Sequence, residues 1–151
     1  NLAKDFIYKK KEIIVTEGYL DVIMLHQAGF TNAVATLGTA LTSDHLPILK
    51  RGEPKIIVAY DGDKAGLNAA YKASLLLSNA TSSFDGGVVI FKEGFDPADM
   101  VQNKQITQLN ELFKTAKPFI PFVIDFIISK FDLSDPAQKQ YALNEANDYL
   151  K

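Results

Sequence analysis

The sequence contains no cysteine and has no large excess of either positive or negative charge. Without cysteine the chain has no disulfide framework, no thiolate ligand for zinc and no thiol nucleophile. The 16 Lys and Arg residues stand against 18 Asp and Glu residues, for a formal net charge of −2. A strongly basic footprint is therefore missing, and we do not expect this chain alone to bind nucleic acid tightly through phosphates.

Long hydrophobic runs are missing as well. The longest apolar stretch covers residues 119–128, which is too short to span a bilayer. The N-terminus has neither an apolar signal core nor an initiator Met, so we expect a piece cut from a longer chain. The 47% of hydrophobic residues in 151 still suffice for the core of one ordinary domain.

Short β-branched runs alternate with helical patterns over residues 12–92. We expect four strands near residues 12–15, 33–35, 55–60 and 88–91, with helices at 19–28, 42–51 and 65–78 between them. This order predicts an α/β fold with a parallel four-stranded sheet and helices on both faces. After Pro97 the pattern is helical, with no convincing strand. We place a domain over residues 1–116 and a helical subdomain, which we expect to be truncated, over 117–151.

Acidic, glycine-containing loops follow three of the four expected strands. Because the carboxyl ends of parallel strands share one sheet edge, these loops should meet there. Gathered carboxylates repel one another unless a cation neutralises them. Neither His26 nor His45 lies in these loops, and an all-oxygen ligand set favours Mg²⁺ or Mn²⁺ over Zn²⁺. The acidic residues of the three loops are Glu17 and Asp21, then Asp61 and Asp63, then Asp96 and Asp99.

Each loop taken alone has a simpler interpretation. Asp63 and Asp96 could cap the helices that follow them, because Asp is a common N-cap. Lys64 could contact a phosphate or lie in solvent at the start of a helix. His26 should be a surface or hydrogen-bonded residue, and His45 should serve the start of its own helix. The convergence of three loops on one edge nevertheless favours a metal site.

The motifs Glu17-Gly18-Tyr19-x-Asp21 and Asp61-Gly62-Asp63-x-Ala65-Gly66, followed by Asp96-Pro97, resemble the TOPRIM domain. This metal-binding fold is shared by bacterial primases, type IA and type II topoisomerases and some nucleases. Three segments resemble the bacterial DnaG-type primases more closely, and Phe131–Ser134 resembles the start of a helix in the subdomain after the TOPRIM fold. The three segments are Val15–Ile23, Leu37–Thr42, which topoisomerases lack, and Tyr60–Gly66.

This resemblance, which covers nearly the whole chain, implies template-directed synthesis of short RNA primers for DNA replication. It implies that Glu17, Asp61 and Asp63 are catalytic and hold Mg²⁺ or Mn²⁺. One departure is that the family usually has Asp-Pro-Asp in the last loop, where this chain has Ala98 in place of the second aspartate. We expect Asp96 to bind metal and Asp99 to substitute from one residue later. The residues expected to face nucleotide or phosphate are Gly18, Asp21 and Lys64.

The same resemblance implies partners and missing parts. The partners would be a single-stranded DNA template, nucleoside triphosphates and the replicative helicase, the last through a C-terminal domain that this chain lacks. Zinc would be confined to an N-terminal module that is also absent. We expect a monomeric fragment of a cytoplasmic bacterial enzyme, without membrane contact and inactive in primer synthesis by itself.

Three alternatives remain open at this stage. The first is another TOPRIM enzyme, either a topoisomerase or a nuclease. The second is a phosphatase-like hydrolase with Asp61 as nucleophile and Asp63 as acid/base, although Ala65 stands where such enzymes usually have Thr. The third is a binding module that docks a partner on a Phe-rich tail, which includes Phe119, Phe122 and Phe126. For that stripe, packing within the chain is the preferred interpretation.

Overall fold

The computed structural model describes residues 3, 5, 7, 9, 11–36, 41–79, 84–92 and 95–151. Part of the Leu37–Thr42 segment therefore lies outside the described residues. The strands are β1 (Glu12–Thr16), β2 (Ala33–Ala35), β3 (Lys55–Val58), β4 (Gly86–Val88) and β5 (Lys117–Pro118). The helices are α2 (Tyr19–Gln27), a 3₁₀ turn at Ser43–His45, α3 (Leu46–Lys50), α4 (Lys64–Ser78), α5 (Pro97–Gln102), α6 (Ile106–Lys114), α7 (Phe119–Ser129) and α8 (Pro136–Leu150).

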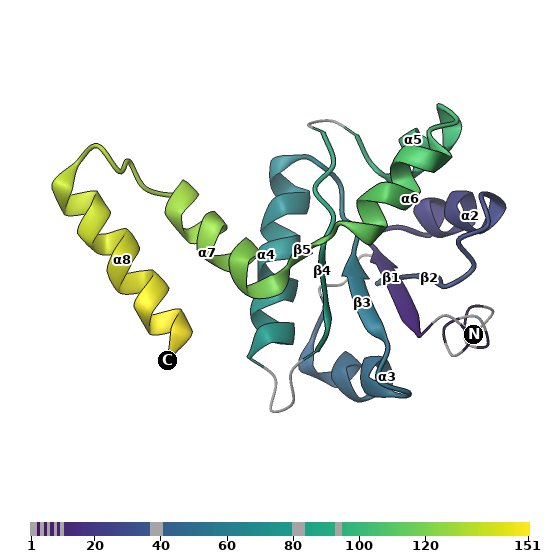
Figure 1. Cartoon of the computed structure of the whole chain (residues 1–151), viewed down its shortest axis with the longest axis horizontal. Coiled ribbons are helices and arrows are strands. Elements are labelled where there is room, and N and C mark those ends of the chain that lie inside the picture. Colours follow the sequence, from purple (N-terminus) through teal and green to yellow (C-terminus); the bar gives the residue numbers. More distant parts are fainter. Residues whose placement is uncertain are drawn as a thin grey trace.

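The five strands form one sheet in the order β2-β1-β3-β4-β5, seen in Figure 1 between two groups of helices. The first four strands are parallel, which confirms the predicted α/β sheet. Each expected helix is present to within a few residues at its ends. The order brings the carboxyl ends of β1, β3 and β4 next to one another.

We expected no strand after Pro97, and this expectation is wrong, because β5 pairs antiparallel with β4. Two residues are too few to produce a periodic pattern, so the local sequence does not predict β5. The pairing depends instead on a glycine in the partner strand. A Cβ at Gly87 would lie 2.3 Å from the carbonyl oxygen of Lys117, so a side chain there would block the approach.

Helices cover both faces of the sheet, as predicted. Alternate residues of each strand enter opposite cores: Ile13 and Val15 point to one face and Ile14 to the other. The first core also takes residues of α3, α4 and α7, and the second takes residues of α2, α5 and α6. Both faces are therefore apolar, which is why the strands lack hydrophobic alternation in sequence.

The Phe-rich tail packs within the chain, as the preferred interpretation had it. Phe119 and Phe122 are buried in the core beside α4, and the Phe126 ring stacks on Tyr71 at a centroid distance of 4.3 Å. The last helix, α8, is tied to α4 by a 2.6 Å hydrogen bond between the hydroxyls of Ser78 and Tyr149. Within the described part of the chain, no helix has both the length and the apolar character needed to cross a bilayer.

Candidate metal centre

Three carboxylates converge where the parallel strands end. One oxygen from each of Asp21, Asp61 and Asp96 lies within 4.8 Å of the other two. Asp21 lies in the first turn of α2, Asp61 follows β3, and Asp96 is the N-cap of α5. The adjacency of β1, β3 and β4 brings these three segments together, as the strand order predicts for a parallel sheet.

Asp61 is partly buried and lies among four other carboxylates. Burial raises its pKa from 3.8 to about 7, and the charges of Glu17, Asp21, Asp96 and Asp63 add to the shift. Its Oδ1 atom is buried and has no hydrogen-bond partner among the described residues. Such an oxygen is costly to bury unless something else compensates it. A divalent cation would supply both a ligand bond and the missing positive charge.

Asp21 is the most deeply buried of the three carboxylates, with 7% of its surface exposed. Burial raises its pKa to about 6, and the charge of Asp96 contributes. Its Oδ1 accepts a 3.2 Å hydrogen bond from the backbone N–H of Ala98. From the sequence we expected Asp21 to face phosphate, whereas the structure places it within the group of three carboxylates. Its position in the first turn of the helix that follows β1, at the same sheet edge as Glu17, was the available signal.

Asp96 and Asp99 form a reciprocal helix cap at the start of α5. The Asp99 N–H donates to Asp96 Oδ1 at 2.8 Å, and the Asp96 N–H donates to Asp99 Oδ2 at 3.1 Å. Burial raises the pKa of Asp96. The Asp99 carboxylate turns back along the chain and, among the described residues, does not join the group of three. The expected capping by Asp96 is thus present.

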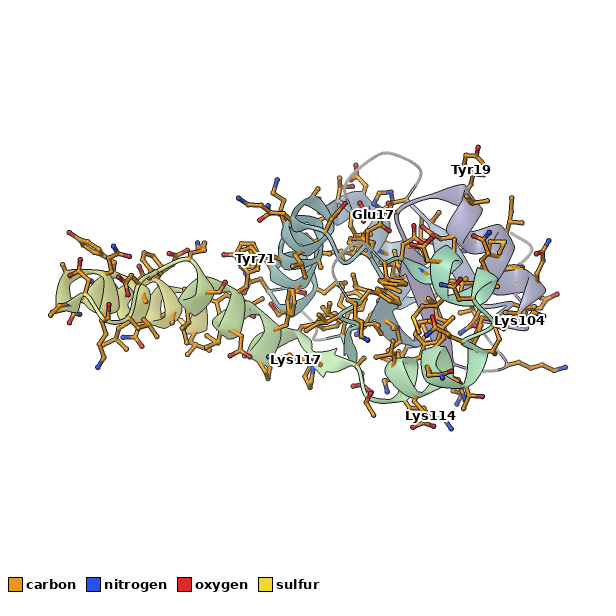
Figure 2. The ribbon with its side chains drawn as sticks, turned by 90° about the horizontal axis from the view of Figure 1, so that it is seen from above. Glu17, Tyr19, Tyr71, Lys104, Lys114 and Lys117 are labelled. Carbon is orange, nitrogen blue, oxygen red and sulfur yellow. The ribbon has the colours of Figure 1, made fainter. Side chains whose placement is uncertain are left out.

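Glu17 and Asp63 flank the group without belonging to it. Glu17 Oε1 accepts a 3.1 Å hydrogen bond from the Asp61 N–H, so it lies directly against the site. Asp63 is the N-cap of α4, and its Oδ1 accepts a 2.7 Å hydrogen bond from the Gly66 N–H, which confirms the capping prediction. Lys64 is exposed at the first position of α4. Figure 2 shows Glu17 near the start of α2, with Tyr19 pointing away from the domain.

Two glycines allow the loops of the site to approach closely. A Cβ at Gly62 would lie 2.2 Å from the Lys92 carbonyl oxygen, and one at Gly66 would lie 2.0 Å from that of Asp61. The Gly62 N–H donates to the Phe95 carbonyl at 2.8 Å, which joins the loop after β3 to the loop before α5. These contacts hold the Asp61 and Asp96 segments side by side. Gly18, the N-cap of α2, contributes a backbone hydrogen bond to Asp21.

Both histidines serve local structure, as expected. His26 Nε2 lies 3.0 Å from the Ala33 carbonyl oxygen, which joins α2 to β2. His45 Nδ1 accepts a 3.0 Å hydrogen bond from the Thr42 N–H at the start of the 3₁₀ turn. The group of three offers carboxylate oxygens as ligands, which fits a hard cation such as Mg²⁺ or Mn²⁺.

Residues 11–83 match the Toprim domain. The chain is 56% identical over 151 residues to the DNA primase of Helicobacter pylori strain J99, and covers 27% of that protein. It is 46% identical over 143 residues to the DNA primase of Campylobacter jejuni, where 95% of this chain matches 23% of the relative. The chain thus spans about a quarter of the length of these curated relatives.

Solved structures agree with the sequence relatives. A DNA primase domain from Pseudomonas aeruginosa has a TM-score of 0.84 at 31% identity, over 98% of this chain and 47% of that one. A DnaG primase catalytic domain bound to single-stranded DNA has a TM-score of 0.78 at 31% identity, over 92% of this chain and 44% of that one. The fold and the sequence therefore lead to the same group of proteins.

Proposed function

The chain corresponds to the Toprim-containing part of the catalytic core of bacterial DnaG-type DNA primases, and we propose that it supplies the metal-binding half of a primer-synthesising active site. The observation that carries this proposal is the group formed by Asp21, Asp61 and Asp96, together with the buried Asp61 Oδ1, which has no hydrogen-bond partner among the described residues. The pKa values of all three carboxyl groups are raised. At neutral pH the ionised carboxylates would repel one another, and a divalent cation bound between them would offset that repulsion.

Asp21, Asp61 and Asp96 would hold Mg²⁺ or Mn²⁺ directly, with Glu17 and Asp63 adding negative charge at the margin. When bound, the divalent cation supplies charge neutralisation for a triphosphate and its departing pyrophosphate. The chain's own part is to fix the carboxylates, since the loops joined by Gly62 and the cap formed by Asp99 leave them little freedom. Lys64 and the Gly18 backbone lie at the same edge, where they can contact phosphate oxygens.

The longer protein would use this half-site with a single-stranded DNA template and nucleoside triphosphates in the bacterial cytoplasm. Helicase contact and zinc binding would belong to segments outside this chain. The near-neutral charge supports the view that template binding needs the rest of the protein. We further propose that residues 1–116 and 117–151 form the metal-binding domain and a helical subdomain, and that the chain alone makes no primers.

Primer synthesis by the full-length protein tests this function. Asp61→Asn and Asp21→Asn should each lower the rate of RNA primer formation on a single-stranded template by at least about 100-fold, as expected when a direct metal ligand is lost. Asp125→Asn is the matched control, because Asp125 is exposed on α7 and pairs with Lys117. The proposal fails if both site variants keep the activity of the control, or if residues 1–151 alone make primers.

A further inference from the structure

A buried hydroxyl closes the turn that carries Glu17. Thr16 is the last residue of β1, and none of its surface is exposed. Its Oγ1 lies 3.2 Å from the Val34 carbonyl oxygen and 3.3 Å from the Gly18 carbonyl oxygen, so one hydroxyl proton is shared between two acceptors. The Thr16 side chain thus joins the far side of the Glu17 turn to the neighbouring strand β2.

Two further hydroxyls flank Glu17 from the adjacent strands. Val15 pairs with Val58 and Thr16 with Ala35, so the same register, continued past the strand ends, places Tyr60 and Thr36 level with Glu17. The Tyr60 ring is buried, with 4% exposed, and its hydroxyl forms a hydrogen bond with the Thr36 side chain. The Thr36 N–H also donates to the Thr16 carbonyl at 3.1 Å.

Glu17, the first residue after β1, therefore lies between Thr36 and Tyr60, whose side chains form a hydrogen bond with each other. Its own carboxylate accepts from the Asp61 N–H, one residue after Tyr60. These hydrogen bonds connect the ends of β2, β1 and β3 with one another, and the bond from the Asp61 N–H to Glu17 connects them to the metal centre.

We propose that Thr16, Thr36 and Tyr60, here called the hydroxyl layer, are positioning residues that hold the Glu17 carboxylate against the Asp61 N–H. None of the three belongs to the carboxylate group, so they act through Glu17 and the Asp61 backbone. Residues behind metal-facing carboxylates fix their orientation and commonly change metal affinity when they are lost. The link from this geometry to metal affinity rests on the proposed function, whereas the link to the Asp61 N–H does not.

The experiment measures Asp61 amide hydrogen exchange by NMR in the metal-free chain, followed by Mn²⁺ affinity by electron paramagnetic resonance. Thr16→Val and Tyr60→Phe keep the shape of each side chain and remove its hydroxyl. Each should make Asp61 exchange roughly tenfold faster, as expected when one hydrogen bond is weakened, and should weaken Mn²⁺ binding by about tenfold. Thr16→Ser restores a hydroxyl and should return Asp61 exchange to within about twofold of wild type.

Tyr149→Phe is the matched control, because it also removes a bonded tyrosine hydroxyl, at Ser78, far along the chain from the site. It should change thermal stability without changing Asp61 exchange. The inference is overturned if Asp61 exchange is unchanged in Tyr60→Phe, or if the control changes it equally. If Thr16→Val does not fold, Tyr60→Phe decides. If wild type binds no Mn²⁺ while Asp61 exchange responds as expected, the proposed function fails and the positioning role stands.

Discussion

The backbone N–H of Ala98 donates a 3.2 Å hydrogen bond to the Asp21 carboxylate, across 77 positions of sequence. This bond joins the start of α5 to the first turn of α2 and lowers the pKa of Asp21, against the larger effect of burial. Ala98 is also the position where the DnaG-type pattern has its second aspartate. At this position the backbone of Ala98 binds the Asp21 carboxylate, while the Ala98 side chain supplies no carboxylate of its own.

Restoring that aspartate should strengthen metal binding at a cost to the metal-free chain. Ala98→Asp places an additional carboxylate at a position that is 9% exposed, close to Asp21. We expect the free energy of unfolding without metal to fall by about 1–3 kcal/mol, and Mn²⁺ binding to tighten by roughly tenfold. Calorimetric titration measures the affinity, and urea unfolding measures the stability. Ala98→Asn controls for size, and equal affinity of the two variants would contradict the prediction.

The metal-free chain should become less stable as the pH rises from about 4 to about 7. The folded-state pKa values of Asp61 and Asp21, about 7 and about 6, lie above the ordinary value of 3.8. In that window the folded chain binds more protons than the unfolded chain, so the free energy of unfolding falls with pH. Thermal unfolding from pH 4 to pH 8 measures this loss. Saturating Mg²⁺ should abolish most of it, and an unchanged slope with Mg²⁺ would contradict the account.

Removing the charge of Asp61 should change the free energy of unfolding and the Mn²⁺ affinity in opposite directions. Asp61→Asn should raise the free energy of unfolding at pH 8 without metal by about 1 kcal/mol, a figure reduced for the partial exposure of Asp61. The same variant should lose Mn²⁺ binding by at least about 100-fold. Urea unfolding and calorimetric titration of one sample give both values. A variant that is less stable than wild type at pH 8 would show that Asp61 is not repelled by its neighbours.

Asp99 should matter for folding and not for binding. Its carboxylate accepts from the Asp96 N–H in the reciprocal cap, so Asp99→Ala should cost about 1 kcal/mol of stability. Mn²⁺ affinity should stay within about twofold of wild type, since Asp99 lies outside the group of three. If Asp99 instead replaces the missing aspartate at position 98, affinity should fall with stability, and titration of this one variant decides between the two roles.

Gly66→Ala tests how closely the loops of the site are packed. Alanine has the higher helix propensity by about 1 kcal/mol, yet its Cβ would lie 2.0 Å from the Asp61 carbonyl oxygen. The clash is with backbone and should outweigh the propensity gain, for a net loss of at least about 2 kcal/mol. Asn68→Ala, on the exposed side of the same helix, is the control and should be neutral or slightly stabilising. Urea unfolding of both variants gives the comparison.

The sequence was sufficient to predict the parallel sheet, the order of its elements and the edge at which the acidic loops meet. Those features depend on periodicity and on the geometry of parallel strands, both of which are local or topological. The strand β5 escaped prediction because its two residues pair through a glycine in β4, a long-range fit that no local pattern contains.

Assignment of the individual carboxylates was less complete. Asp61 and Asp96 were placed at the metal and do lie in the group of three, whereas Asp21 was assigned to phosphate. Which carboxylate of a loop points inward depends on where the neighbouring helices pack. Asp63, for example, is held outside by its hydrogen bond to the Gly66 N–H. The roles of all these residues at a metal remain predictions.

The central claim is that Asp21, Asp61 and Asp96 share one divalent cation. Amide NMR of the chain during Mn²⁺ titration tests it most directly, because the paramagnetic ion broadens nearby signals. A shared cation should cause early broadening at Gly18, Gly62 and Ala98, which should be unchanged in Asp125→Asn and abolished in Asp61→Asn. Broadening that is scattered over the surface, or equal in both variants, would contradict it.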